Sequence, residues 1–213
     1  VCIVSFPRSG HHAMMGFMKR VSDLADDYCE FYNCKTHDGK AIDCPKKLLS
    51  WRLKGQQCGA GRRVTKTHDF DLALPIRRKW KYVVQYRHPV PAIQSWYELE
   101  SRKKNLDAAR FARESLRFWK AFMEKWVFSL PAADNVLRVN YDTLARVETL
   151  REVAGFCQAQ LDIPRGFSPN FALRRSTEEI PPVMQRLEQE IVPLLERAGI
   201  ERMYSHSGDS SLA

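Results

Sequence analysis

The stretch that decides the fold is VCIVSFPRSGHH, residues 1–12. Its first six residues are mostly apolar and rich in β-branched side chains, which is typical of a strand buried in a parallel sheet. The turn Pro7-Arg8-Ser9-Gly10 comes next, and apolar residues then recur at helical spacing from His11 to Asp26. The chain is therefore expected to open with a strand, a glycine-containing turn and a helix.

The same alternation continues along the chain. Further strands are predicted at Arg63–Thr67, Lys81–Arg87 and Asn135–Tyr141. Helical patterns cover Val90–Glu100, Asp107–Phe128, Thr143–Gln160 and Pro182–Ala198, and Pro193 is expected to kink or split the last of them. Strands that alternate with helices indicate an α/β fold, with a parallel sheet flanked by helices on both faces. Ligands of such sheets bind at the carboxyl ends of the strands.

Length and composition fit one globular domain over residues 1–213. The chain is 44% hydrophobic and 28% charged, which excludes wholesale disorder, collagen and coiled coil. Residues 27–61 are expected to be an insertion that shapes an acceptor site, and residues 205–213 a flexible tail. No apolar run is long enough to span a membrane. We expect a cytoplasmic protein, or one of the Golgi lumen if an N-terminal anchor has been trimmed.

The charge balance favours anionic partners. Lys and Arg number 34 and Asp and Glu 25, a net charge of +9. Such an excess favours binding to nucleic acid, a membrane surface or a phosphorylated small molecule. The alternative is that the basic residues only keep the surface soluble. From Lys46 to Lys66 there are basic residues and no acidic one, so this segment is expected either to attract an anionic donor or acceptor or to be a solvated loop.

Four cysteines, Cys29, Cys34, Cys44 and Cys58, lie in or near the same segment. They include no C-x-x-C pair, so a zinc site is not expected. Free thiols are favoured, and one or two disulfides stay open.

The turn at residues 7–12 has the ingredients of a phosphate cradle. A glycine lets backbone N–H groups close on an anion, and the helix N-terminus adds a partial positive charge. Arg8 contributes a full positive charge on a planar guanidinium group. The first glycine and the Lys-Ser/Thr pair of the Walker A pattern are absent. The alternative is a plain strand-to-helix turn.

A second motif, Lys66-Thr67-His68, falls at the predicted end of the second strand. Histidine is suited to proton transfer near neutral pH. Lys66 lies two residues before His68, so on a strand both side chains point to the same side. The alternative is a surface lysine and a capping histidine.

A third motif is Arg87 at the end of the strongest predicted strand, with Ser95 in the helix that follows. A guanidinium group and a hydroxyl at this spacing are able to bind the same phosphate. An arginine in an ion pair and a serine on a helix surface would have the same pattern.

Together these motifs resemble the PAPS-dependent sulfotransferase superfamily, whose donor is 3′-phosphoadenosine 5′-phosphosulfate (PAPS). Members carry a loop such as PRSGTT after the first strand, a KTH tripeptide at a strand end, and an Arg followed by Ser after the central strand. This chain has PRSGHH, Lys66-Thr67-His68, and Arg87 with Ser95. The looser matches are Tyr141-Asp142-Thr143-Leu144 for the family's Y-E-D-L and Arg174-Arg175 for a late basic loop.

The resemblance implies a donor site. It assigns the 5′-phosphate to Arg8, Ser9, Gly10 and the amides that follow, and the 3′-phosphate to Arg87 and Ser95. Arg174 and Arg175 would complete the 3′-phosphate site, and Tyr141 would pack near the adenine. The product nucleotide would be 3′,5′-adenosine bisphosphate (PAP), and no metal is expected.

The resemblance also implies the chemistry. His68 would deprotonate a hydroxyl or amine of a small-molecule or carbohydrate acceptor, while Arg8 and Lys66 stabilise charge on the leaving oxygen. The chain departs from the family where two hydroxyl residues usually follow the loop glycine. His11 and His12 stand there, and contact with either phosphate or acceptor is open to them.

Two other classes stay open as alternatives. A P-loop nucleotide kinase or NTPase would need a magnesium-binding carboxylate at a strand end; the strand to Arg87 lacks one, and Asp142 follows a later strand. A basic nucleic-acid-binding protein would fit the charge, but no recognised binding motif is present.

Overall fold

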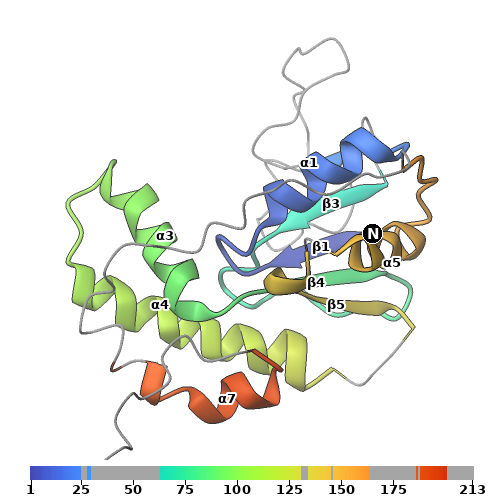
Figure 1. Cartoon of the computed structure of the whole chain (residues 1–213). Coiled ribbons are helices and arrows are strands. Elements are labelled where there is room, and N and C mark those ends of the chain that lie inside the picture. The colour runs from blue at the N-terminus through green and yellow to red at the C-terminus, as the bar shows by residue number, and fades with distance from the viewer. Residues whose placement is uncertain are drawn as a thin grey trace, which may run out of the picture.

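The computed structural model describes residues 1–24, 28–29, 63–130, 134–144, 146–163, 186 and 188–200. Within them, five strands form one sheet in the order β2-β3-β1-β4-β5, and every neighbouring pair is parallel (Figure 1). The strands are β1 (Cys2–Ser5), β2 (Tyr28–Cys29), β3 (Val64–Thr67), β4 (Tyr82–Tyr86) and β5 (Val136–Asn140).

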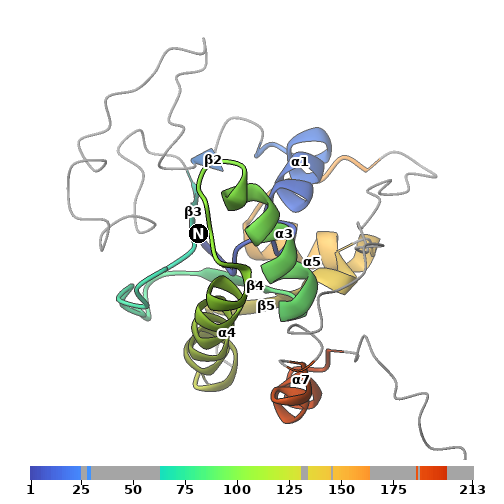
Figure 2. The same cartoon turned by 90° about the vertical axis from the view of Figure 1, so that its left-hand side faces the viewer.

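Helices cover both faces of this sheet, as Figures 1 and 2 show. One face packs against α1 and α5, and the other packs against α3, α4 and the residues around α7. The predicted α/β class with a parallel sheet is confirmed. The helices are α1 (His11–Val21), α3 (Pro89–Ser101), α4 (Ala108–Met123), α5 (Val147–Phe156) and α7 (Val192–Arg197), with a π-helical turn η2 (Glu124–Phe128) and a 3₁₀ turn η3 (Tyr141–Thr143).

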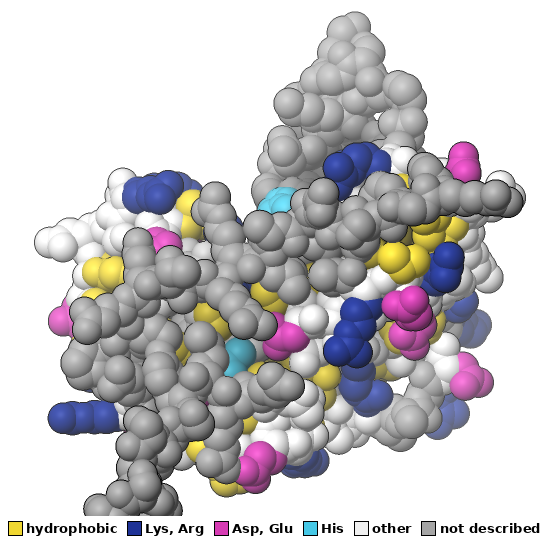
Figure 3. Space-filling model, in the orientation of Figure 1, with side chains coloured by type: hydrophobic (Ala, Val, Ile, Leu, Met, Phe, Trp, Pro, Cys, Tyr) yellow, Lys and Arg dark blue, Asp and Glu magenta, His cyan; other side chains and the backbone are white. Residues whose placement is uncertain are grey.

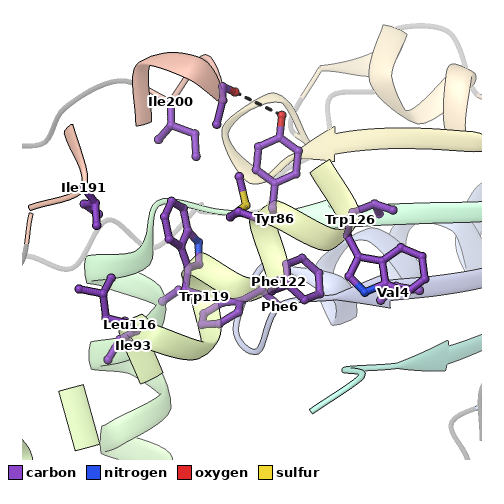
Figure 4. Packing of buried hydrophobic residues seen from close by; sticks show 14 of the residues in the cluster. Val4, Phe6, Tyr86, Ile93, Leu116, Trp119, Phe122, Trp126, Ile191 and Ile200 are labelled. Carbon is purple, nitrogen blue, oxygen red and sulfur yellow. Dashed lines mark hydrogen bonds between the residues drawn. The ribbon is translucent and has the colours of Figure 1, made fainter. Parts of the chain in front are cut away.

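Alternate residues of the central strands feed two separate cores. Val4 and Val84 face the α4 side, where Trp119, Phe122 and Trp126 are fully buried (Figure 4). Tyr86 extends this core to the C-terminal segment, because its hydroxyl donates a hydrogen bond to the Ala198 carbonyl oxygen at 3.4 Å. The opposite core is built on α1 and α5 and includes Ile3, Val83, Met14, Phe17, Met18, Leu150 and Val153.

Strand register brings the candidate motifs to one edge. Val4 pairs with Thr67, Ser5 with Gln85, and Tyr86 with Asn140. The loops after β1, β3, β4 and β5 therefore emerge side by side at the carboxyl end of the sheet, where open α/β folds bind their ligands.

Several element boundaries differ from the predicted ones. The first helix ends at Val21 rather than Asp26, because the backbone at Ser22 is extended and the Ser22 hydroxyl donates to the Met18 carbonyl oxygen at 2.6 Å. Strand β2 lies in a segment predicted as loops and short helices. Its two residues show too little periodicity to be recognised, and their pairing with β3 defines them as a strand.

Two of the predicted helices are each divided. The pattern over 107–128 is α-helical only to Met123 and continues as the π-helical turn η2. The last helical pattern breaks near Ile191, and Pro193 lies in the first turn of α7, where a missing N–H costs nothing. The expected split at Pro193 is thus confirmed. Most of 27–61, all of 205–213, Arg174 and Arg175 lie outside the described residues.

In the part of the chain that the structure describes, no helix is both long and apolar enough to cross a membrane.

Candidate active site

A cavity of about 470 Å³ opens where the strand ends meet. Its wall comes from the loop after β1, the start of α1, the end of β3, and the segment from β4 into α3. The lining includes most of the site residues predicted from sequence: Arg8, Gly10, His11, His12, Lys66, His68, Arg87, Ser95 and Tyr141. The structure therefore brings together motifs that are more than 130 residues apart in the chain.

The loop after β1 depends on a glycine at position 10. Gly10 has φ 78°, in the left-handed region, and caps the N-terminus of α1. A Cβ atom at this position would lie 2.5 Å from Cδ2 of Tyr141, which is closer than real Cβ contacts allow. Arg8 also has a positive φ, 63°, and a non-glycine residue keeps such a backbone only where its surroundings hold it.

The loop presents polar groups that suit an anion. The first N–H groups of α1 have no acceptor within the helix, and the helix dipole makes this end partly positive. The Ser9 hydroxyl oxygen is buried and has no hydrogen-bond partner among the described residues. A buried, unsatisfied hydroxyl is costly, so this atom fits a loop whose polar groups are completed by a ligand.

The two arginines of the site are joined through the loop. Arg8 donates from Nε to the Ser95 hydroxyl oxygen at 2.9 Å, and Arg87 donates from Nη1 to the Arg8 carbonyl oxygen at 3.3 Å. The Arg87 guanidinium lies 3.9 Å from the centre of the Tyr141 ring, a cation–π contact. Burial lowers the pKa of Arg87, and a guanidinium stays charged at physiological pH.

Tyr141 supports both the loop and Arg87. It packs against Gly10 on one side and Arg87 on the other, and it is almost fully buried. Its ring holds the loop and the arginine in place relative to each other.

The tautomer of His68 follows from its partners. Its Nδ1 lies 2.6 Å from the Ser5 carbonyl oxygen, which only accepts hydrogen bonds, so Nδ1 carries the proton and donates. In the neutral ring the lone pair is then on Nε2. The Ser5 hydroxyl is a second neighbour of Nδ1 at 3.3 Å. His68 thus lines the cavity, and its neutral ring would have the tautomer that a general base requires.

The two histidines of the loop are in contrasting environments. His11 is buried, and its Nε2 forms a hydrogen bond with the Tyr28 hydroxyl. Burial, followed by the positive charge of Lys66, holds the pKa of His11 well below its ordinary value, so the ring is neutral at physiological pH. His12 is exposed and lines the cavity. Of the two, His12 is the one whose ring is accessible to solvent.

An aromatic wall beside His68 was not anticipated from sequence. Phe70 is 56% exposed, its ring centre lies 5.2 Å from that of His68, and it also contacts Trp96 and Phe118 at 5.7 and 5.8 Å. The signal was present, because Phe70 lies two residues after His68 and Trp96 directly follows Ser95. Phe70, Trp96 and Leu99 form the apolar side of the cavity.

His88, next to Arg87, is the second unexpected site feature. Its Nε2 donates to Glu188 Oε1 at 2.9 Å, and both side chains are buried. The Val90 N–H donates to His88 Nδ1 at 3.3 Å. Burial, helped by the charge of Arg87, lowers the pKa of His88 to about 4. Although Glu188 would favour a charged ring, protonation would break the bond from Val90, so we assign a neutral His88.

The carboxylate on which the kinase alternative depends does not line the cavity. Asp142 is exposed in η3, and the Asn140 side chain accepts a hydrogen bond from its backbone N–H at 3.2 Å. Among the described residues of the lining, Glu100 in α3 is the one that is acidic.

Comparison with known proteins adds two structural neighbours. No family model and no curated protein matches the chain. A sulfotransferase from Alicyclobacillus acidocaldarius aligns at 15% identity with a TM-score of 0.49, over 94% of this chain and 96% of its own. Mouse sulfotransferase SULT7A1, solved in complex with PAP, aligns at 14% identity with a TM-score of 0.47, over 99% of this chain and 68% of its own. Both neighbours are sulfotransferases.

Proposed function

We propose that the protein transfers a sulfuryl group from PAPS to a hydroxyl or amine of an acceptor. The observation that carries this proposal is the meeting, in one cavity, of an anion cradle at Arg8, a buried cation at Arg87 and an Nε2 lone pair at His68. A doubly phosphorylated donor needs two separate cationic sites, and transfer to an alcohol needs a base beside them.

On the donor side, the loop would hold the 5′-phosphate with Arg8, the Ser9 hydroxyl and the amides that follow Gly10. Arg87 and Ser95 would hold the 3′-phosphate. The Tyr141 ring, stacked against the Arg87 guanidinium, would keep that group in position. The Arg8–Ser95 hydrogen bond would be exchanged for contacts with the donor. Arg174 and Arg175 remain predicted contributors to the same phosphate.

On the transfer side, His68 would take the proton of the acceptor at Nε2 while Nδ1 stays bonded to Ser5. Positioned general bases of this kind contribute about 10²–10⁴ in rate. Arg8 and Lys66 would stabilise the negative charge that moves to the leaving oxygen. In sulfuryl transfer, as in phosphoryl transfer, the protein contributes mainly by positioning the reactants and by stabilising charge in the transition state. Fixed cations are able to do both.

The acceptor would enter against the aromatic wall. Phe70, Trp96 and Leu99 favour an acceptor that carries its reacting hydroxyl or amine on an apolar body. His12 and Glu100 are the polar groups at the border of this side. A small molecule fits these surroundings better than a highly anionic glycan does.

The test is a transfer assay without divalent metal. The protein is incubated with PAPS, EDTA and either 2-naphthol or glucosamine, and PAP release and acceptor mass are followed. We expect PAP to form in step with a sulfated acceptor, and His68→Ala to abolish most of both. Magnesium-dependent hydrolysis or transfer from ATP, without PAP formation from PAPS, would favour the kinase alternative instead.

A further inference from the structure

Asp69, the residue after His68, is buried and has no role in the proposed chemistry. It does not line the cavity, and its side chain is 1% exposed. Its Oδ1 accepts a hydrogen bond from the Leu74 N–H at 2.8 Å. Its Oδ2 accepts from Lys125 Nζ at 2.7 Å and from Trp126 Nε1 at 2.9 Å. Both oxygens of the carboxylate are therefore engaged, one by the loop that follows Asp69 and the other by the distant residues 125 and 126.

Lys125 is engaged just as fully. Besides Asp69, its ammonium donates to the carbonyl oxygens of Leu72 and Leu74 at 2.8 and 2.7 Å. All three of its protons are thus directed at the loop that follows His68. Through Lys125 this loop is attached to the end of α4.

The π-helical turn η2 makes the double contact possible. Lys125 and Trp126 are consecutive, and on a regular α-helix neighbouring side chains do not face the same partner. The turn from Glu124 to Phe128 departs from α-helical register, and both side chains reach the same carboxylate oxygen. Single π-helical turns are rare, and many of those that occur lie at functional sites.

The contacts of the Asp69 side chain hold a left-handed backbone turn in place. Asp69 has φ 47°, a left-handed conformation that is uncommon among non-glycine residues and that aspartate adopts more readily than most. This turn comes directly after His68 and directly before Phe70, so it sets the direction in which both rings leave the chain. Buried ion pairs are weak contributors to stability and are better attested as devices that specify one geometry.

We propose that Asp69, Lys125 and Trp126, the Asp69 anchor, position His68 for proton transfer. The anchor fixes the turn after His68, and the turn keeps Nδ1 on the Ser5 carbonyl oxygen, which leaves the lone pair on Nε2. Asp69 and Lys125 are in this account positioning residues, since neither lines the cavity. The inference rests on the proposed function in that it gives His68 the role of base.

The first test observes the ring without any substrate. In the wild-type protein, ¹⁵N NMR of the histidine rings, assigned with His68→Gln, should show His68 protonated at Nδ1. Lys125→Met should turn this signal into that of a ring exchanging between both tautomers. Lys120→Met, the same substitution at a position in α4 where the lysine pairs with the exposed Glu190 at 3.7 Å, should leave it unchanged. An unchanged His68 signal in folded Lys125→Met would overturn the proposal.

The second test asks whether the anchor acts through His68. With PAPS and 2-naphthol, Lys125→Met should lower single-turnover transfer at least about tenfold, while the Kd for PAP stays within about twofold. In a His68→Ala background the same substitution should have no further effect, because coupled residues are not additive. Equal losses in both backgrounds would identify a general structural role and refute the inference.

A variant without an unpaired buried charge guards against misfolding. Asp69→Asn combined with Lys125→Met removes both charges, and it should show the same tautomer change and the same loss of transfer. Retention of wild-type transfer by this double variant would also refute the anchor. If wild-type protein binds no PAP at all, the proposed function fails, whereas the NMR result still decides whether the anchor orients His68.

Discussion

At the scale of single residues, the site depends on close packing beneath the loop after β1. Gly10 touches Tyr141, Tyr141 stacks on Arg87, and Arg87 donates back to the Arg8 carbonyl oxygen. Tyr141 and Arg87 are both buried, so a change of one methyl group against them is expected to be felt.

Gly10→Ala should lower the free energy of unfolding by about 2–4 kcal/mol, because it adds both a clash with Tyr141 and strain at a positive φ. Gly16→Ala is the matched control. Gly16 lies in the middle of α1 with nothing within 4 Å of its Cβ position, so alanine there should stabilise the helix by about 0.5–1 kcal/mol. Urea denaturation of both variants measures the difference, and equal effects would refute the packing account.

His68→Ala should lower the rate of transfer at least about 100-fold. Affinity for PAP should change little, since the proposed phosphate contacts come from other residues. Single-turnover transfer at saturating PAPS is compared with a thermal melt of the same preparation. A folded variant that turns over at a near wild-type rate would show that His68 is a structural residue at the end of β3.

At the scale of elements, the sequence predicts the strands well and the ends of helices less well. The strands β1 and β4 are mostly apolar and are buried along their whole length, which is a strong local signal. The short strand β2 and the turn η2 depend on partners far away in the chain, β3 for the one and Asp69 for the other. No local pattern contains such information.

The same distinction applies to the site. Arg8, Lys66, His68 and Arg87 were predicted because parallel strands align their carboxyl ends. Several contacts around them were not predicted. These are His68 with the Ser5 carbonyl oxygen, Asp69 with Lys125 and Trp126, and the buried pair of His88 with Glu188. They are contacts across the fold, and they carry no sequence signature.

The C-terminal segment gives a prediction about acid stability. The pKa of His88 is about 4 in the folded protein and that of an ordinary histidine is 6.5. Between these values the unfolded chain binds a proton that the folded chain does not, so the free energy of unfolding falls as pH drops from 6.5 towards 4. The lowered pKa of His11 acts in the same direction.

His88→Gln should flatten this dependence, since the amide still donates to Glu188 and does not titrate. Thermal melts at several pH values between 4 and 7 measure the slope, and His12→Gln, at an exposed position, serves as the control. An identical slope in His88→Gln and wild type would show that the buried His88–Glu188 pair does not contribute.

At the scale of the whole molecule, the fold brings basic side chains from separate strand ends into one cavity. On the face in Figure 3, the described Lys and Arg side chains lie among Asp and Glu. The cavity, in contrast, collects Arg8, Lys66 and Arg87 from three different strand ends. A site that converges in this way suits a compact, multiply charged ligand better than an extended polyanion.

The most direct test of the central claim is calorimetry of the wild-type protein with PAP and with AMP, both without magnesium. We predict that PAP binds at least about tenfold more tightly, because its 3′-phosphate adds charged hydrogen bonds worth about 1.5–3 kcal/mol each. Arg87→Ala should erase this preference and leave AMP binding nearly intact, while Arg110→Ala, which removes an exposed ion pair with Glu114, should change neither. Equal affinities of the wild-type protein for PAP and AMP would contradict the assignment of a PAPS site.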